Sequence, residues 1–224
     1  MAGAIGTFIA GMQYLFSNFS EFLSLLQRHL ALVFISEGAA ILIAVPLGVI
    51  AARYDRAKGP ILSIGNVAQT VPPLAVLALA FPLLGLGYRP SVVALFVYAL
   101  LPVLTNTIAG IESVDENTID AARGMGMTEN ERLREIQLPL ALPIIFAGIR
   151  TSTVINVGTA YLAFFIGGGG LGSWVISGIN LFNMPQVMAG AVAGALLAIT
   201  LDLGLAAVEG RLSDSGVEMT QSVA

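Results

Sequence analysis

Long apolar runs are the feature that most constrains the fold of this chain. A helix needs roughly 20 apolar residues to cross a bilayer, and the sequence holds five runs of about that length, at 30–52, 61–81, 91–111, 140–165 and 187–208. Charged residues make up 11% of the 224 residues, compared with about 25% in soluble domains. The sequence therefore predicts an all-α, polytopic membrane protein with five spans.

A further apolar segment, residues 5–26, precedes these runs. It is rich in aromatic residues but is interrupted by polar side chains, namely Gln13, Ser17, Asn18, Ser20 and Glu21. This mixture is typical of an amphipathic helix that lies in the membrane interface, with a sixth span as the alternative. Basic residues are absent before Arg28, whereas a cleavable signal peptide begins with a positively charged region.

Basic residues in the short loops predict the orientation, because Lys and Arg accumulate on the cytoplasmic side. They follow the first, third and fifth runs, as Arg53, Arg56, Lys58, Arg123, Arg132, Arg134 and Arg211. The opposite side has only Arg28 and Arg89, and Arg150 lies within snorkelling reach of the basic side. We therefore expect the N-terminus outside and the C-terminus in the cytoplasm.

The expected organisation has three parts. Residues 1–28 form the interfacial segment, and residues 29–212 form the membrane domain. Residues 213–224 form an acidic cytoplasmic tail that we expect to be frayed. The membrane domain contains one charged cytoplasmic loop, residues 112–139, which is called the central segment below.

Several classes of function find no support in the sequence. The chain has no cysteine and one histidine, His29, so neither a thiol nucleophile nor a metal site is indicated; a histidine at a membrane edge is expected at the surface. The net charge of −4 argues against nucleic-acid binding. No GxxxxGK[ST] phosphate loop occurs, and Lys58 is the single lysine. We expect no catalytic residue, no metal and no cofactor in this chain.

The central segment carries helix-start and helix-stop signals. Residues 113–116 fit the capping box S-x-x-E, and residues 128–131 fit T-x-x-E. Gly124 and Gly126 lie between the two signals and favour a turn. The pattern predicts a short helix, a glycine turn and a second helix that ends near Pro139.

One side of the first of these helices is built from small and flexible residues. Ala121, Ala122 and Met125 fall on or near the same side at helical spacing, and the alanines would allow another backbone to approach closely. The residues alone leave two interpretations open, a solvated loop with two helical turns or a docking element for a cytoplasmic partner.

The central segment resembles the EAA motif of the membrane subunits of binding-protein-dependent ABC importers. That motif reads E-A-A, three residues, G, nine residues and I-x-L-P. Every spacing is matched here by DAA at 120–122, Gly126 and IQLP at 136–139. The one departure is Asp120 in place of glutamate, which keeps the carboxylate but shortens its reach by one methylene.

This resemblance implies a coupling helix that docks in a groove of an ABC ATPase subunit. The residues carried over to that role are Asp120, Ala121, Ala122, Arg123, Gly124, Met125 and Gly126. It also implies that ATP and Mg are bound by the separate ATPase chain. The further partners implied are an extracytoplasmic substrate-binding protein and a second permease, either a copy of this chain or a paralogue, in the cytoplasmic membrane of a prokaryote.

Nearly the whole chain, about residues 28–212, is similar to the osmoprotectant branch of these permeases. The similar stretches include HLALVFISEGAAILIAVPLGV, NVAQTVPPLAVLAL and AGIRTSTVINVGTAYLAFFIGGGGLG. The resemblance implies a five-span type I importer fold and a quaternary ammonium or betaine-type solute, such as glycine betaine, choline or carnitine. The sequence shows no aromatic cage for such an ion, so the individual solute stays open.

Polar groups inside the apolar runs mark either a solute pathway or contacts between helices. Glu37 and Asp202 are the two deep carboxylates, and we favour helix bonding over cation guidance for them. Prolines within the second run predict a break or kink, which is tolerated where it lines a cavity and equally compatible with packing alone. The candidate pathway residues are Gln69, Thr70, Pro72, Pro73, Asn106 and Asn156.

A glycine run, FIGGGGLG, ends the fourth apolar stretch. Without a Lys-Ser or Lys-Thr after it, a phosphate cradle is a poor interpretation. We expect a turn at the outer mouth formed by Gly167, Gly168, Gly169 and Gly170, with Trp174 as an interfacial anchor.

Three hypotheses on function remain in competition. The favoured one is a non-catalytic permease subunit of an ATP-driven importer. A secondary transporter or channel would work without ATP and would have Glu37 and Asp202 as ion-coupling groups. An intramembrane enzyme would need a paired nucleophile and base, and none stands out in the sequence.

Overall fold

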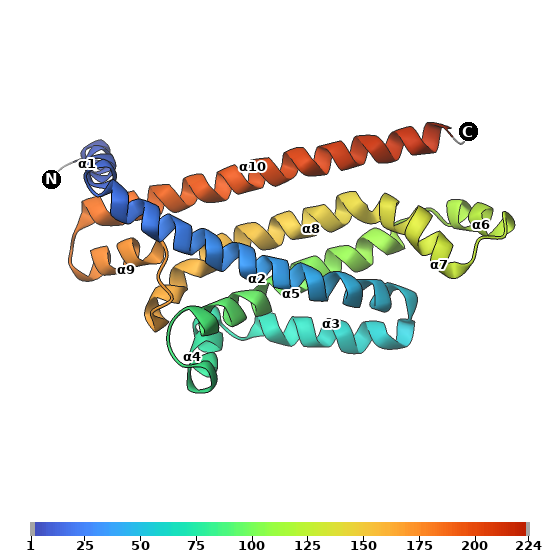
Figure 1. Ribbon diagram of the computed structural model, residues 1–224, viewed down its shortest axis with the longest axis horizontal. Helices are drawn as coiled ribbons and strands as arrows, with labels where there is room; N and C mark the ends of the chain where they lie inside the picture. The colour runs from blue at the N-terminus through green and yellow to red at the C-terminus, as the bar shows by residue number, and fades with distance from the viewer. Residues whose placement is uncertain (1–2, 223–224) are drawn as a thin grey trace.

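The computed structural model describes residues 3–222, and this part of the chain is helical with short connections and no strand (Figure 1). The elements are α1 Ala4–Ser17, α2 Phe19–Arg53, α3 Asp55–Thr70, α4 Pro73–Leu84, α5 Tyr88–Glu112, α6 Glu116–Gly124, α7 Glu129–Glu131, the π-helix η1 Arg132–Gln137, α8 Leu138–Thr159, the 3-10 helix η2 Ala160–Ile166, α9 Gly172–Asn180 and α10 Met184–Ser222. The all-α prediction is confirmed.

Within residues 3–222, four helical stretches are long and apolar enough to cross a membrane, and a bent pair brings the number to as many as five. The four are α2, α5, the stretch from α7 to η2, and α10 up to Leu212. The bent pair is α3 and α4, which meet at 98°. The break lies at Pro72 and Pro73, where prolines remove backbone donors and obstruct the preceding turn. The predicted break is confirmed and is much sharper than a kink.

The N-terminal segment is not the single helix expected at residues 5–26. The helix ends at Ser17, and Asn18 caps it by donating from Nδ2 to the carbonyl oxygen of Tyr14 at 2.9 Å. α2 then begins at Phe19, well before the apolar run at 30–52, and its axis crosses that of α1 (Figure 1). A side chain that can bond its own backbone competes with helix continuation, which explains the interruption.

α1 lies against the N-terminal part of α10 and exposes apolar side chains on its other side. Gly11 approaches Met188 closely enough that a Cβ would be 2.8 Å from the methionine Cβ. Ile5, Phe8 and Phe16 are about half exposed or more. A helix with apolar side chains exposed at the end of a membrane bundle suits the interface.

The core lies where α5 packs between α2 and α8. Its buried members include Ala44, Val103, Ile108 and Ile145. Small residues let the helices approach closely, as is common between helices in membranes. A Cβ on Gly148 would be 2.4 Å from the Cβ of Asn106, so this position on α8 has no room for a side chain.

The expected C-terminal tail is the last part of α10. α10 continues as helix through residues 213–222, so the helix does not end near Arg211. Val223 and Ala224, the last residues of the expected tail, lie outside the described part of the chain.

Candidate functional site

The central segment caps the bundle at the end opposite α1 and α9 (Figure 1). The residue before α6 is Asp115, which is its N-cap. Ser113 instead donates from Oγ to the carbonyl oxygen of Gly110 at 2.8 Å and so closes α5. The capping box expected at residues 113–116 is therefore wrong, because the serine hydroxyl is used by the preceding helix.

The predicted glycine turn follows α6. Gly126 has a φ of 85°, a left-handed conformation that glycine adopts without the steric cost of a Cβ. The backbone N–H of Met127 donates to the carbonyl oxygen of Ala122 at 3.2 Å, which folds the chain back over the end of α6. The turn is confirmed.

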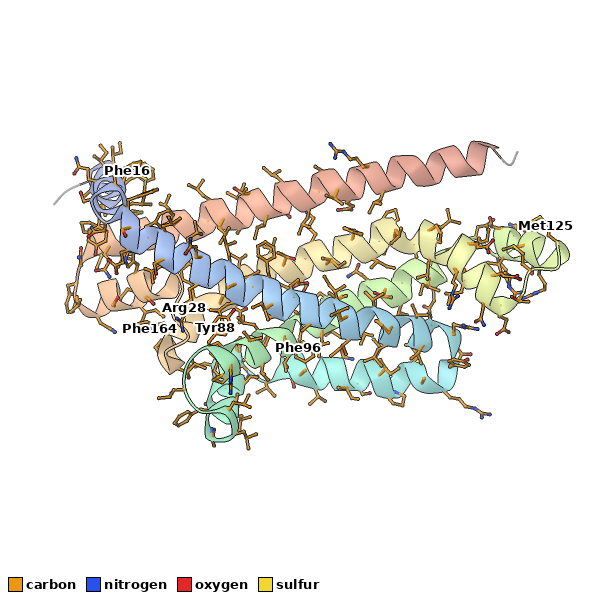
Figure 2. All side chains as sticks on the ribbon, in the orientation of Figure 1. Phe16, Arg28, Tyr88, Phe96, Met125 and Phe164 are labelled. Atoms are coloured by element: carbon orange, nitrogen blue, oxygen red, sulfur yellow. The ribbon has the colours of Figure 1, made fainter. Side chains whose placement is uncertain are left out.

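The two alanines of the motif lie on different sides of α6. Ala122 is 1% exposed and faces the rest of the segment, since α6 packs against η1. Ala121 and Met125 are exposed, and Met125 lies at the tip of the molecule (Figure 2). The expectation that all three share one side is wrong for Ala122, which is small enough to let α6 close onto η1.

Asp120 and Arg123 form an ion pair on the surface of α6. Arg123 Nη1 is 2.9 Å from Asp120 Oδ1, and both side chains are exposed. Exposed pairs contribute little to stability, so the two charges remain accessible to a partner. Gly124 ends the helix and has open space around it.

The second capping box is present as predicted. The backbone N–H and the hydroxyl of Thr128 donate to Glu131 Oε2 at 2.7 and 2.8 Å. The Glu131 N–H donates back to Thr128 Oγ1 at 3.4 Å. The bonds from the Thr128 backbone and hydroxyl lower the pKa of Glu131, because they stabilise its ionised form.

The helix that follows this cap does not end near Pro139. α7, η1 and α8 form one continuous helical stretch that runs into the membrane span, from Glu129 to Ile166 with η2. Pro139 lies in the first turn of α8, directly after the π-helical turn. A wider turn gives room for the proline ring and its missing donor. The end of the motif is thus joined rigidly to a span.

Two tethers fasten the central segment to the neighbouring helices, and no sequence pattern predicted either of them. Arg53, the last residue of α2, donates to Asn130 Oδ1 at 3.0 Å and to Glu129 Oε2 at 3.1 Å. Lys58 on α3 donates to both oxygens of Glu112 at 2.6 and 2.8 Å. These bonds fix the direction of the segment relative to the bundle.

Glu37 lies buried where α2 meets α8. Its Oε2 accepts hydrogen bonds from Ser152 Oγ at 3.0 Å and from Asn156 Nδ2 at 2.8 Å. Asn156 is fully buried, so this candidate pathway residue bonds helices together in the described structure. The favoured interpretation of Glu37 as a helix-bonding group agrees with these contacts.

Asp202 on α10 is paired with Arg150 on α8. The guanidinium Nε and Nη2 lie 2.5 and 2.9 Å from the two oxygens of Asp202, and Nη1 lies 3.4 Å from Glu209. About a third of the Arg150 and Asp202 side chains is exposed. Arg150 therefore holds α10 to α8. Its guanidinium is paired with carboxylates of α10 and does not extend unpaired toward the end of the bundle where the other basic residues lie.

The remaining candidate pathway residues lie around the helix break and on α5. Gln69 Nε2 donates to the carbonyl oxygen of Tyr98 at 3.2 Å, and the Tyr98 hydroxyl donates to that of Val71. Thr70 ends α3, while Pro72 and Pro73 begin α4. Asn106 bonds the carbonyl oxygen of Pro102 one turn earlier on α5. Within residues 3–222, no hydrogen bond joins the groups at the break to Asn106 or Asn156.

The glycine run at the opposite end forms a turn held by α2. Gly167, Gly169 and Gly170 have φ values of 75°, 80° and 83°, and the carbonyl oxygen of Gly168 accepts from Arg28 Nε at 2.8 Å. The Arg28 guanidinium also lies 5.7 Å from the ring centroid of Tyr88, and the two side chains are labelled next to each other in Figure 2. Sequence reasoning did not identify Arg28 as the residue that fixes this turn.

His29 and Trp174 are buried, which corrects both expectations. His29 Nε2 lies 3.1 Å from the carbonyl oxygen of Val157, and Nδ1 accepts from the Leu171 N–H at 3.2 Å. Trp174 is 1% exposed and packs against Tyr14 at 5.3 Å between ring centroids. α1 covers the indole, so it cannot serve as an interfacial anchor.

Comparison with known proteins gives concordant results. The family model for the binding-protein-dependent transport system inner membrane component matches residues 44–214. The choline transport system permease protein OpuBB of Bacillus subtilis is 44% identical over 92% of this chain and 95% of its own length. The osmoprotectant import permease protein OsmY of Salmonella typhimurium is 47% identical over 91% and 87%.

Solved structures agree on the fold. An inward-facing MetNI methionine ABC transporter chain superposes with a TM-score of 0.80 at 19% identity, covering 90% of this chain and 97% of the other. An amino acid ABC transporter chain gives 0.73 at 21% identity, covering 89% and 97%. The match to the family model over most of the chain, with these relatives, shows that the chain belongs to the family of binding-protein-dependent transport system inner membrane components.

Proposed function

We propose that this chain is the permease subunit of an ATP-driven importer for quaternary ammonium or betaine-type osmoprotectants. The observation that carries the proposal is that the functions named for the relatives agree with the structure of the central segment. Relatives above 40% identity are named as choline, carnitine, glycine betaine or osmoprotectant permeases, and the matching motif forms a tethered, exposed cap on the bundle. An extracytoplasmic binding protein would deliver the solute, and a separate ATPase chain would bind ATP and Mg.

The central segment is the proposed docking element for the ATPase. Asp120, Ala121, Arg123 and Met125 offer an exposed surface on α6, while Ala122 and Gly126 shape the helix and its turn. Because α7, η1 and α8 are continuous, a displacement of the segment would be carried into the fourth span. Arg53 would transmit the same displacement to α2. In this proposal the segment and residues 213–224 are cytoplasmic and the N-terminus is outside.

The partly exposed ion pair of Arg150 and Asp202 supports a second permease beside this chain. Charged groups inside a membrane face protein or a water-filled cavity, because exposure to lipid is costly. Arg150 and Asp202 line a depression of about 350 Å³ with Thr151 and Ile155. A copy of this chain or a paralogue on that face would enclose the pair and complete a solute path between the two permeases.

The proposal is tested by uptake into proteoliposomes that hold this chain, its ATPase and its binding protein. Labelled glycine betaine and choline are supplied with and without ATP on the side of the ATPase. Uptake that requires both ATP and the binding protein is the expected result. Uptake that does not depend on ATP or on the ATPase chain would favour a secondary transporter and would contradict the proposal of an ATP-driven importer.

A further inference from the structure

An open groove of about 730 Å³ lies between α2, α8 and α10, away from the Arg150–Asp202 pair. Its walls are almost entirely carbon surface, contributed by residues such as Gly38 on α2, Leu142 on α8 and Leu205 on α10. Glu37 is at one end but is 3% exposed, with one oxygen held by Ser152 and Asn156. It offers the groove very little polar surface, so the site suits an apolar occupant.

The groove has the length of one membrane leaflet. Along α8 it extends from Leu138 to Thr153, which corresponds to about 22 Å at 1.5 Å per helical residue. One leaflet of a bilayer is about 20–22 Å thick when its headgroup region is included, and about 15 Å of this is hydrocarbon. The groove therefore extends from the middle of the span to the end of the bundle that carries the central segment.

A cationic side chain stands at that end. Arg134 on η1 lines the groove and is exposed. Within residues 3–222 its side chain makes no ion pair or hydrogen bond. An apolar groove of leaflet length with an uncompensated guanidinium at headgroup level is complementary to a phospholipid with an anionic headgroup, since phosphate is a preferred partner of arginine.

We propose that this groove binds one acyl chain of an anionic phospholipid from the leaflet on the side of the central segment, with the headgroup phosphate on Arg134. The choice of leaflet rests on the proposed function, which makes that side cytoplasmic. The bound lipid fills the space between α2, α8 and α10 beside Glu37. It thereby links the packing of the spans to the helix that carries the central segment.

The test measures phospholipid retained by the purified complex of this chain with its ATPase, by native mass spectrometry in detergent with added phosphatidylglycerol. Gly38→Leu fills the groove without a clash, since a Cβ at Gly38 meets nothing within 4 Å. Gly204→Leu on α10 is the matched control, because Gly204 is equally open and does not line the groove. Gly38→Leu should lower retention several-fold relative to Gly204→Leu.

The headgroup is tested with Arg134→Gln against Arg56→Gln, both exposed arginines. Arg134→Gln removes the guanidinium that lines the groove, and it should reduce the preference for phosphatidylglycerol over phosphatidylethanolamine by about fivefold, the effect of one basic residue beside an anionic headgroup. Arg56 does not line the groove, so Arg56→Gln should leave the preference of the bound lipid unchanged. Should Gly38→Leu fail to assemble, Ile41→Cys labelled with a bulky maleimide after assembly blocks the same groove, since the chain has no other cysteine.

Equal retention by Gly38→Leu and Gly204→Leu would overturn the lipid site. So would saturable binding of tetramethylammonium that Glu37→Gln abolishes, which would show that the groove receives an ammonium ion. The same variants are assayed for ATP-driven uptake. Equal lipid retention by the two glycine variants, with ATP-driven uptake by the wild type, would mean that the groove proposal fails while the proposed function holds. Absence of ATP-driven uptake by the wild type would mean that the proposed function itself fails.

Discussion

Single glycines decide how closely the spans of this protein can pack. At Gly148 a Cβ would meet Asn106 Cβ at 2.4 Å and the carbonyl oxygen of Pro102 at 2.9 Å. At Gly48 it would meet Thr107 at 2.6 Å. Backbone and branched side chains cannot give way cheaply, so these glycines set the distance from α5 to α8 and α2.

Gly148→Ala is expected to destabilise the protein by about 1–3 kcal/mol, the cost of overpacking a close contact. Gly158→Ala on the same helix has open space and should be neutral or slightly stabilising, because alanine favours helix over glycine. Thermal unfolding of the two variants in the same detergent checks the difference. Equal melting temperatures would mean that α5 and α8 are not packed as described.

Arg53 is the residue that ties α2 to the central segment. The Arg53 side chain is 23% exposed, and the Glu129 side chain with which it pairs is 76% exposed. Because ion pairs exposed to solvent contribute little to stability, the contribution of this pair is small. Arg53→Gln should therefore leave assembly intact and lower solute uptake per ATP hydrolysed. Arg56→Gln, in the next helix, is the control. An unchanged ratio of uptake to hydrolysis for Arg53→Gln would remove the tether from the coupling route.

Several residue placements could not be predicted from the sequence. His29 and Trp174 looked like surface and interface residues because only their position near span ends was known. Their burial depends on contacts between segments far apart in the chain, because the end of the glycine turn covers His29 and α1 covers Trp174. Asp202 and Arg150 were each noticed, but their pairing needed the spatial order of α8 and α10.

At the scale of elements, the glycine turn after α6 sets the direction of the proposed docking surface. Gly126→Pro should insert normally but abolish ATP-driven uptake, because proline cannot adopt the φ of 85° and loses the N–H that donates to Arg123. Gly124→Ala should retain uptake, since its Cβ meets nothing within 4 Å. Normal uptake by Gly126→Pro would contradict the coupling role of this turn.

The capping box at Thr128 makes the start of α7 sensitive to acid. The folded state lowers the pKa of Glu131 below its ordinary value of 4.5. Its stabilising effect is therefore complete above the pKa of the unfolded state and is lost as the pH falls through the folded pKa. Glu131→Gln mimics the acid form at neutral pH. Amide hydrogen exchange at residues 128–131 should be several-fold faster in this variant than in Glu129→Gln, and equal protection would contradict the cap.

The sequence predicted elements better than their junctions. Hydrophobic length identified the spans, and the prolines and glycines identified the break after α3 and the turn after α6. Helix ends were missed where a local side chain intervened, as at Asn18, or where a helix continued past an unfavourable residue, as at Pro139. The π-helical turn of η1 reflects a compromise between Pro139 and the packing of α6, which periodicity alone does not reveal.

At the scale of the whole molecule, continuous helices join the two ends of the bundle. The central segment lies at one end, and the glycine turn held by Arg28 lies at the other (Figure 1). The stretch from α7 to η2 connects the two ends without a break. A displacement of the central segment can therefore reach the glycine turn at the other end through a single helical stretch, as the proposed importer cycle requires.

The most direct measurement is site-specific cross-linking between this chain and its ATPase. Met125→Cys places a lone thiol on the docking surface, at a position that is 72% exposed, and Leu181→Cys places one at the opposite end, at a position that is 71% exposed. A short bifunctional maleimide with a single-cysteine ATPase should link the Met125→Cys variant and leave Leu181→Cys unlinked. Absence of a link at Met125, or equal linking at both positions, would contradict docking through the central segment.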